Sequence, residues 1–539
     1  MSAAHELIDR GFSVEVYETN RQYCGGKARS VNVPGTANEN PDSALPGEHG
    51  FRFFPGFYKH ITDTMSRIPY RDENGHMNRH GVLDNLTPTE SIMIARTNGE
   101  PIITSATFPR SLKQLELVLK VMFGGDDSGL TPEEEKFFAE RVWQLMTSCQ
   151  ERRQNFYEKV GWWEYMEADR FSDTYRHLLV EGLTRTLVAA QAKLASTKTG
   201  GDIFLQLIFN MMDPFVNADR VLNGPTNDKW LDPWLAYLTG KGVRYHLNNK
   251  VDSLEVADGK IAAAMITDED GNVKRITSDI FLSAVPVEVF AGLITPDMIA
   301  LDSTFTQIQT LANNVQWMNG LQFFLNQDVS INKGHIIYCD SQWAVTSISQ
   351  VQFWKGFDIT KCYNGKVKGV LSVDISDWNS VGYNGKIAKD CTAEEIKDEI
   401  WKEIKAAVNY GGKNILTDDM VETWYLDHDI RPGTENTINH DKEPLLVNNI
   451  NTWCLRPTAY TNIPNLFLSG DYVRTYTDLA TMEGANESAR RAVNCIIDAT
   501  GTDADLCEIW PLSEPLLLVP FREMDKLRWE KGMPWKNPL

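Results

Sequence analysis

The sequence contains no Cys-x-x-Cys pair, no apolar run long enough to cross a bilayer and no signal-peptide pattern at its start. Its eight cysteines are scattered along 539 residues. Zinc motifs and disulfide frameworks both need closely spaced cysteines, so neither is indicated. We therefore expect no metal site, no membrane-spanning helix and a reducing, cytoplasmic location.

Positive charge is also scarce, because 53 Lys and Arg face 73 Asp and Glu, which gives a net charge of −20. Such a charge excludes nucleic acid as an expected partner and disfavours purely electrostatic docking to an anionic membrane. The hydrophobic fraction of 42% is that of a globular protein. A chain of this length is expected to form two or three domains with a large core.

The sequence also lacks the Gly-x-Gly-x-x-Gly loop that opens a nucleotide-binding βαβ unit. It begins with a predicted helix over Ser2–Arg10, followed by an alternating strand over Phe12–Glu18 and a glycine turn over Cys24–Ser30. This order is typical of the second half of such a unit. There, a carboxylate at the place of Glu18 binds ribose hydroxyls. A solvated strand end and a plain turn are the alternatives.

A second informative stretch lies near the C-terminus. A short buried strand over 465–469 is closed by Gly470-Asp471, and a helix follows Thr481. One face of this helix carries only very small side chains, which permits close approach of a neighbour. They are Ala485, Ser488, Ala489 and Ala492. The turn Met482-Glu483-Gly484 offers unpaired N–H groups at the positive end of the helix dipole, a place for an anion or an electron-rich ring edge.

Gly470-Asp471, followed by Met482-Glu483-Gly484-Ala485, resembles the closing motif of the FAD-dependent amine oxidase and carotenoid (phytoene) desaturase superfamily. The turn Gly25-Gly26-Lys27-Ala28-Arg29-Ser30 resembles the Gly-Gly-[Arg/Lys]-x-x-Ser segment of the same superfamily. The resemblance covers most of the chain and implies that the cofactor is FAD.

The resemblance also implies a role for each matching residue. Glu18 would bind the adenosine ribose, Lys27 and Arg29 would lie beside the pyrophosphate, and Val251 would contact the adenine. Asp471 would interact with the ribitol and phosphate portion, and the N–H groups at 482–484 would meet the flavin ring. The implied cofactor-binding residues are Glu18, Gly25, Gly26, Lys27, Arg29, Gly47, His49, Gly50, Val251, Gly470, Asp471, Met482, Glu483 and Gly484.

The chain departs from the superfamily pattern at its start, which lies inside the helix that should follow the missing glycine loop. The absent strand is normally central, so its loss would leave a gap between neighbouring strands. A start assigned too late, a shortened form and a form that binds FAD poorly are the three explanations. Every cofactor assignment is conditional on the full-length form.

The Gly-rich aromatic segment over 47–58 matches the part of superfamily members that lines the flavin ring and the substrate entrance. His49 and Arg52 are its candidate catalytic residues. A structural histidine is the alternative for His49, and Arg52 could hold an anionic group or pair with Glu48.

The predicted fold class is α/β: an FAD-binding Rossmann-like domain without its first strand, a mixed-sheet substrate domain and a helical insertion. The FAD-binding domain is expected in three parts, with the helical substrate-channel subdomain at 111–224, the mixed α/β substrate domain at 301–450 and a C-terminal tail at 506–539. The three parts of the FAD-binding domain are 1–110, 225–300 and 451–505. Thr131-Pro132 and Thr392 are predicted to begin amphipathic helices.

The preferred function is hydride transfer to flavin from an apolar, isoprenoid- or carotenoid-like small molecule. The pattern around Arg456-Pro457 and Gly470-Asp471-Tyr472 is most similar to carotenoid desaturase-like and hydroxysqualene dehydroxylase-like proteins. A flavin amine oxidase is the alternative, although Thr481 stands where that branch carries an aromatic residue. An inactive binding protein that lacks the phosphate loop is the third hypothesis.

The tail from Glu514 to Trp529 is first apolar and then basic and amphipathic. It could dock on the protein itself or lie on a membrane surface as a peripheral contact. The oligomeric state is left open.

Overall fold

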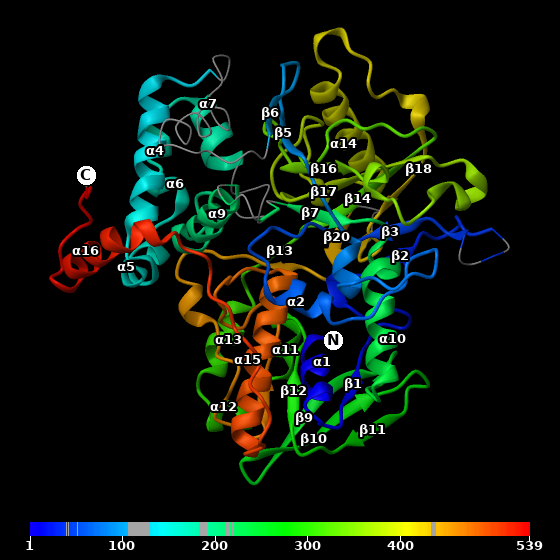
Figure 1. Cartoon of the computed structure of the whole chain (residues 1–539), viewed down its shortest axis with the longest axis vertical. Helices are drawn as coiled ribbons and strands as arrows, with labels where there is room; N and C mark the ends of the chain where they lie inside the picture. Colours follow the sequence, from blue (N-terminus) through cyan, green and yellow to red (C-terminus); the bar gives the residue numbers. More distant parts are fainter. Residues whose placement is uncertain are drawn as a thin grey trace.

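The computed structural model describes residues 1–38, 40, 43–50, 52–105, 129–182, 191–211, 213, 216–217, 219–432 and 438–538. They form three lobes (Figure 1). The lower lobe holds both the first helix, α1 (Ser2–Asp9), and α15 (Met482–Thr500). A large sheet forms the upper lobe, and a helical lobe carries α16 (Val519–Glu530) at its outer edge. The predicted α/β architecture with a helical insertion is confirmed.

Short parallel strands from distant parts of the chain define the lower lobe. β1 (Glu15–Tyr17) pairs with β8 (Arg244–His246), and β12 (Phe281–Ser283) pairs with β22 (Leu466–Leu468). Among the described residues these pairs are two separate two-stranded sheets. An antiparallel sheet lies beside them, with β9 (Lys250–Ala257), β10 (Lys260–Thr267) and β11 (Val273–Ile276). The remaining helices of this lobe are α2 (His60–Ser66), α10 (Asp232–Gly240), α11 (Val287–Leu293), α12 (Pro296–Leu301) and α13 (Phe305–Leu311).

A mixed sheet of seven strands supports the upper lobe, in the order β18-β14-β17-β16-β15-β5-β6. Its strands are β18 (Val421–Leu426), β14 (Asn319–Leu325), β17 (Gly369–Ile375), β16 (Val345–Ser349), β15 (Ile336–Tyr338), β5 (Ser91–Ala95) and β6 (Ile102–Ser105). The strand β14, second in this order, is buried on both faces, and Leu and Phe occupy four of its seven positions. Leu321 and Phe323 pack in the core formed with α14 (Ala393–Val408), whereas Phe324 packs with Val31 on the other side.

The strands β5 and β6 extend this sheet, although they lie in the range 1–110 that the sequence assigns to the FAD-binding domain. β5 pairs in parallel with β15 through Ile336 and Met93. The domain boundaries as a whole stay a prediction, and this pairing indicates that the first segment contributes to two lobes.

The helical lobe confirms the expected capping signals. The Thr131 hydroxyl accepts from the Glu134 N–H and the Glu134 carboxylate accepts from the Thr131 N–H, which begins α4 (Pro132–Thr147). Thr392 caps α14 in the same way through Glu395. The other helices of the helical lobe are α5 (Gln150–Asn155), α6 (Trp162–Tyr165), α7 (Asp173–Tyr175) and α9 (Thr197–Met211).

Short two-stranded sheets join the lobes. They are β2 (Ser30–Asn32) with β3 (Pro46–Glu48), β4 (Leu86–Pro88) with β7 (Arg220–Leu222), β13 (Val315–Gln316) with β21 (Leu445–Leu446), and β19 (Ile430–Pro432) with β20 (Ile438–Asp441). None of the helices in the described part of the chain combines the length and apolar character needed to cross a membrane. Parts of the predicted helical subdomain at 111–224 lie outside the described residues.

Candidate functional site

The first helix and the long helix α15 lie side by side in the lower lobe (Figure 1). Asn486, in the second turn of α15, donates to the Ser2 hydroxyl at the start of α1, at 3.0 Å. Ala3 of α1 packs against Ala489 and Val493, which explains the very small side chains on α15. The positive ends of the two helix dipoles therefore meet at one edge of the lobe.

The first turn of α15 offers two free donors. Thr481 caps the helix by accepting from the Gly484 N–H at 3.1 Å. Among the described residues, no acceptor is hydrogen-bonded to the N–H groups of Met482 and Glu483. A Cβ at Gly484 would lie 2.7 Å from the Leu479 carbonyl oxygen. The packing of the preceding loop thus requires glycine here.

The Glu483 side chain points away from these donors and caps a second helix. One carboxylate oxygen accepts from the N–H groups of Lys59 and His60, and the other accepts from that of Ile61, at 2.8, 3.0 and 2.9 Å. The His60 Nδ1 also lies 2.7 Å from the carboxylate. Glu483 therefore joins α15 to the start of α2, so only its backbone is free to meet a ligand.

The Gly25-Gly26 turn lies beneath the upper lobe and is held by Arg52. Gly25 has φ +100°, and a Cβ there would lie 2.5 Å from Leu231, so this position requires glycine. The Arg52 guanidinium donates to the carbonyl oxygens of Lys27, Ala28 and Gly50. These bonds fix the turn against the 47–52 segment, and the predicted catalytic role of Arg52 stays a prediction.

Residues from both ends of the chain share one electrostatic neighbourhood. Burial raises the pKa of Glu288, in the first turn of α11, and the charges of Lys27 and Asp471 both act on it. The Glu288 Oε1 is buried and has no hydrogen-bond partner among the described residues. Burial also raises the pKa of Glu18. The nearby charge of Glu443 raises this pKa further, and that of Arg29 lowers it. Lys27 and Asp471, one from each sequence motif, thus lie near the same buried acid, and the cofactor-binding role of the motif residues stays a prediction.

His49 is buried and forms an ion pair with Asp427, which follows strand β18. Its side chain is 8% exposed, and that of Asp427 is 3% exposed. Burial acts to lower the pKa of His49, but the adjacent Asp427 carboxylate outweighs it and raises that pKa. The Nε2 atom is buried and has no hydrogen-bond partner among the described residues. The Asp427 carboxylate therefore favours the cationic form of His49, and the buried Nε2 has no partner among the described residues.

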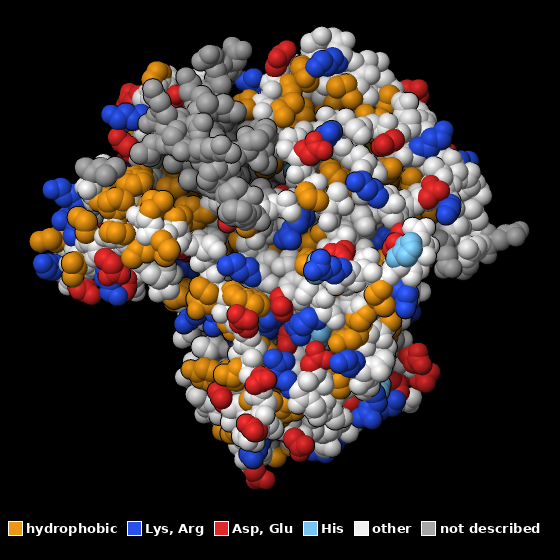
Figure 2. Space-filling view, viewed as in Figure 1, with side chains coloured by type: hydrophobic (Ala, Val, Ile, Leu, Met, Phe, Trp, Pro, Cys, Tyr) orange, Lys and Arg blue, Asp and Glu red, His pale blue; other side chains and the backbone are white. Residues whose placement is uncertain are grey.

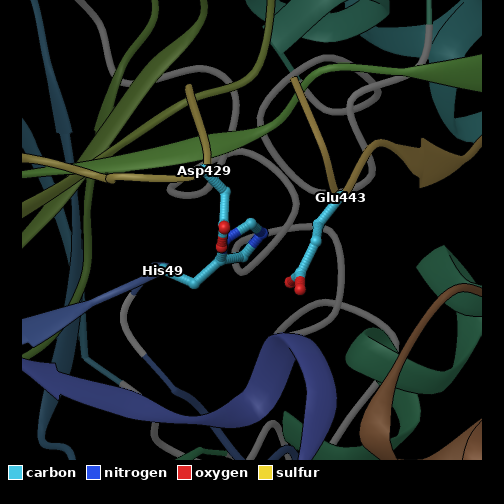
Figure 3. Close-up of side chains that lie close together, drawn as sticks. All are labelled: His49, Asp429 and Glu443. Atoms are coloured by element: carbon cyan, nitrogen blue, oxygen red, sulfur yellow. The ribbon is translucent and has the colours of Figure 1, made fainter. Parts of the chain in front are cut away.

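Acidic residues surround His49. Figure 3 shows its imidazole between the carboxylates of Asp429 and Glu443. Ligand-type atoms of these three residues lie within 4.8 Å of one another. Arg29 offsets part of the charge, because its Nη2 donates to Asp429 at 2.7 Å and its Nη1 to Glu443 at 3.0 Å. Asp441 is also buried, and one of its oxygens has no partner among the described residues. We call Asp427, Asp429, Asp441 and Glu443 the acidic cluster; the absence of a metal stays a prediction.

The predicted glycines at 47 and 50 pack against the upper sheet. A Cβ at Gly47 would lie 2.6 Å from the Tyr425 ring, and one at Gly50 would lie 2.4 Å from the Asp374 carboxylate. The Gly320 N–H on β14 also donates to the His49 carbonyl oxygen at 2.6 Å. Close packing on the sheet accounts for both glycines, and their cofactor-binding role stays a prediction.

Glu48 lies at a pocket between these segments. The pocket is lined by Glu48, Arg52, Val221, Leu222, Gly224, Thr226, Ile348, Gln350, Phe353 and Trp354. The Glu48 carboxylate accepts from the N–H and the hydroxyl of Thr226 at 3.1 and 3.0 Å. Burial nevertheless raises the pKa of Glu48 to about 7, against the opposing effect of Arg52.

A buried ion pair ties the helical lobe to the loop that precedes α15. The Lys198 ammonium of α9 donates to Asp478 at 2.7 Å, and these side chains are 3% and 2% exposed. Trp453 Nε1 donates to the same carboxylate at 2.6 Å. Asp478 has φ +50°, a conformation that non-glycine residues rarely adopt. The pair therefore holds a strained loop in place next to the free donors of α15.

A sequence model of the family described as "Flavin containing amine oxidoreductase" matches residues 1–497. The chain belongs to this family. Its cofactor is therefore FAD, as predicted. No curated protein is similar enough in sequence to match this flavin-dependent oxidoreductase.

Solved structures show the same fold at low sequence identity. Putrescine oxidase bound to putrescine is 12% identical, over 92% of this chain and 96% of that one, with a TM-score of 0.58. Cyclohexylamine oxidase from Brevibacterium oxydans is 12% identical, over 93% and 97%, with a TM-score of 0.59. A putative protoporphyrinogen oxidase from Exiguobacterium is 14% identical, over 93% and 96%, with a TM-score of 0.56. At these identities the similarity establishes the fold of the flavoprotein.

The residues at the meeting point of α1 and α15 fit FAD. The free N–H donors of α15 and the positive end of the α1 dipole suit an electron-rich ring edge and a pyrophosphate. Among the described residues, no donor is hydrogen-bonded to the Asp471 carboxylate, which leaves it available for hydroxyl groups. The Glu18 carboxylate accepts only from the nearby Asn20 N–H within that part of the chain, at 2.8 Å. Val251 lies in β9 beside the parallel strands, partly buried.

The sequence motifs did not reveal the acidic cluster, Glu48 as a titrating group, or the Lys198–Asp478 pair. Asp427-His428-Asp429 follows a strand, and this alternation of acids is the one local signal that could have drawn attention to the cluster. Lys198 and Asp478 are 280 residues apart, so no spacing rule connects them.

Proposed function

We propose that this flavoprotein removes a hydride from a carbon atom of an apolar, isoprenoid-like small molecule, in the manner of a desaturase. The meeting of α1 and the start of α15 supports the flavin-dependent part of the proposal, because it presents free backbone donors to a ligand. FAD, when bound, supplies the hydride acceptor. We further propose that the reaction takes place in the cytoplasm.

In this proposal the residues of the chain hold and orient the cofactor. Glu18 binds the ribose hydroxyls, Lys27 lies beside the pyrophosphate, and Val251 contacts the adenine. Arg29, which the sequence placed beside the pyrophosphate, instead donates to Asp429 and Glu443 in this structure. Asp471 binds the ribitol, and the N–H groups of Met482 and Glu483 bind the ring edge. Arg52 keeps the Gly25-Gly26 turn in position through its three backbone contacts.

His49 and Glu48 are the groups that hold protons in the proposed site. His49 keeps a proton on Nε2 because Asp427 stabilises its cationic form. Glu48 is poised to accept or release a proton near neutral pH, since its pKa is about 7. Loss of a proton from the carbon next to the hydride donor completes the formation of a double bond.

Amine oxidation is a second candidate, and the acidic cluster favours it. Several buried carboxylates beside the 47–52 segment would stabilise an ammonium group, whereas they offer nothing to a hydrocarbon. Thr481 argues against it, because a threonine cannot form an aromatic wall for the amine. The proteins with similar folds include oxidases of putrescine and cyclohexylamine, which makes this candidate worth testing directly.

The experiment has two steps. Purified protein is first titrated with FAD, and binding is followed by the change in visible absorbance of the flavin. The loaded protein is then mixed anaerobically with polyisoprenoid hydrocarbons or with primary amines and diamines. Bleaching of the flavin by polyisoprenoids alone supports the desaturase proposal. Bleaching and peroxide release with amines alone overturn it in favour of an amine oxidase, and failure to bind FAD contradicts both.

A further inference from the structure

The C-terminal helix α16 is fixed firmly to the helical lobe by its inner face. Asp525 is 3% exposed and accepts from Arg152 Nε and Nη2 at 3.0 and 2.9 Å, and from the Cys149 N–H at 2.9 Å. Phe521 packs edge-on against Trp143, and the Arg152 guanidinium lies over the Trp529 ring. Docking of this tail on the protein and docking on a membrane surface are therefore compatible, because only the inner face of the helix is packed against the protein.

The outer face of the same segment is apolar and exposed. Leu516 and Leu517, in the turn before the helix, are 86% and 70% exposed. Met524 and Leu527 are 52% and 58% exposed. Met524 and Leu527 lie three residues apart on α16, so they share one face of the helix. Leu516 and Leu517 precede the helix and continue this apolar surface. We call Leu516, Leu517, Met524 and Leu527 the outer stripe.

The charge around the outer stripe differs from that of the whole chain. Residues 516–538 contain five cationic and three acidic side chains, in a protein of net charge −20. One of the acids is Asp525, which is buried against Arg152. Lys526 pairs with Glu151 at 2.8 Å, whereas Lys531 and Lys536 are exposed beyond the end of the helix. In Figure 2 apolar side chains gather on this lobe, with Lys and Arg along its outer edge.

We propose that the outer stripe docks on an anionic lipid bilayer. Its leucines enter the boundary between headgroups and acyl chains, and Lys531 and Lys536 lie near the lipid phosphates. The combination of exposed leucines on a rigid, laterally placed helix with flanking lysines fits a lipid surface. This docking does not depend on the proposed reaction, although a bilayer would also be a source of apolar substrate.

Vesicle co-sedimentation of the full chain tests the proposal. Vesicles of phosphatidylcholine with 30% phosphatidylglycerol are compared with vesicles of phosphatidylcholine alone. The triple variant Leu516→Ser, Leu517→Ser and Leu527→Ser is the test protein. Its matched control replaces three similarly exposed apolar side chains elsewhere, Met77→Ser, Val273→Ser and Val381→Ser, at 54%, 63% and 56% exposure. A charge variant carries Lys531→Glu and Lys536→Glu.

The native chain and the matched control are expected to bind the anionic vesicles, and the triple variant to bind at least tenfold more weakly. The charge variant should lose about tenfold in affinity for anionic vesicles, and added salt should weaken binding of the native chain. FAD titration and thermal unfolding should be unchanged in the triple variant. Equal vesicle binding by all four proteins overturns the proposal, as does absence of binding by the native chain. Concentration-dependent dimers that the triple variant abolishes, without vesicle binding, would assign the stripe to self-association instead.

Discussion

Glu48 carries a carboxyl group that the fold keeps almost fully out of water, since it is 2% exposed. Its hydrogen bonds to Thr226 and its proximity to Arg52 do not offset the cost of burying the charged form. A buried acid with a raised pKa makes stability depend on pH, because the folded chain binds the proton more tightly than the unfolded chain does.

Replacement of Glu48 by Gln should remove this dependence. The pKa rises from 4.5 to about 7 on folding, so the native chain should lose about 3 kcal/mol of stability as the pH rises from about 4.5 to about 7. The Glu48→Gln variant should be the more stable protein above neutral pH. Chemical denaturation between pH 5 and 8 measures this difference. The exposed Glu508→Gln change is the control, and a parallel pH profile for both variants would contradict the prediction.

The ion pair of His49 and Asp427 is a second contact whose contribution to stability depends on pH. Asp427→Asn leaves a buried imidazolium without its counter-charge, which should cost about 3 kcal/mol near pH 6. The contribution of His49 is complete below its ordinary pKa of 6.5 and is lost as the pH rises through its raised pKa. The cost should therefore shrink by pH 9, as denaturation curves at the two pH values will reveal.

A matched control exists in the exposed pair of His80 and Asp84, whose side chains are 54% and 34% exposed. Asp84→Asn should change stability by less than about 1 kcal/mol. If Asp427→Asn changed stability by as little as Asp84→Asn does, burial would not strengthen the ion pair of His49 and Asp427.

At the scale of elements, the attachment of α9 to the loop before α15 decides how firmly the proposed flavin donors are held. Lys198 and Trp453 both bond the carboxylate of Asp478, and the Asp478 N–H donates to the Thr475 hydroxyl at 2.9 Å. These contacts keep a residue with positive φ in a loop of only a few residues that leads into the first turn of α15.

Lys198→Met should therefore loosen this loop and weaken FAD binding. It leaves a buried carboxylate without a cation, so we expect a loss of about 3 kcal/mol in stability. The same variant should bind FAD more weakly, which flavin titration will show as a larger dissociation constant. The combined Lys198→Met and Asp478→Asn variant should recover part of the stability, since the buried carboxylate at 478 that lost its lysine is then replaced by a neutral amide.

Lys333→Met removes a lysine from an exposed pair with Glu90 and serves as the control. It should change stability by less than about 1 kcal/mol and leave FAD affinity unaltered. Unchanged flavin affinity in Lys198→Met would show that the loop is held by other contacts.

At the scale of the whole molecule, the lower lobe joins segments from both ends of the chain, and a ligand bound between them should stabilise the entire fold. Free FAD at about 100 times its dissociation constant should add about 2.7 kcal/mol. The thermal midpoint should therefore rise with FAD concentration, which calorimetry or dye-based melting can follow.

Asp471→Ala and Glu18→Ala should each reduce this FAD-induced rise while leaving the midpoint without FAD nearly unchanged. The reason is that neither carboxylate has a long-range ion pair among the described residues. Asp297→Ala, on α12, is a control outside the proposed site. A full FAD-induced rise in all variants would place the cofactor elsewhere.

Local sequence patterns determined much of this protein. Thr131 and Thr392 specify helix starts through their own side chains and a glutamate three residues on, so their effect needs no distant partner. The small residues of α15 likewise indicate close packing against a neighbour, and the two glycines at 25 and 26 indicate a turn. These patterns were sufficient to identify the flavin-dependent family and the α/β class.

Only the tertiary structure decided which charges meet. Asp427 reaches His49, and Lys198 reaches Asp478, across hundreds of residues. Burial acts to lower the pKa of His49, but the adjacent Asp427 carboxylate raises it, whereas burial itself raises the pKa of Glu48. The tertiary structure also shows that close packing requires glycine at 47, 50 and 484, which no sequence motif indicates. Electrostatic energies depend on distance and on the exclusion of water, and both quantities exist only once the chain has folded.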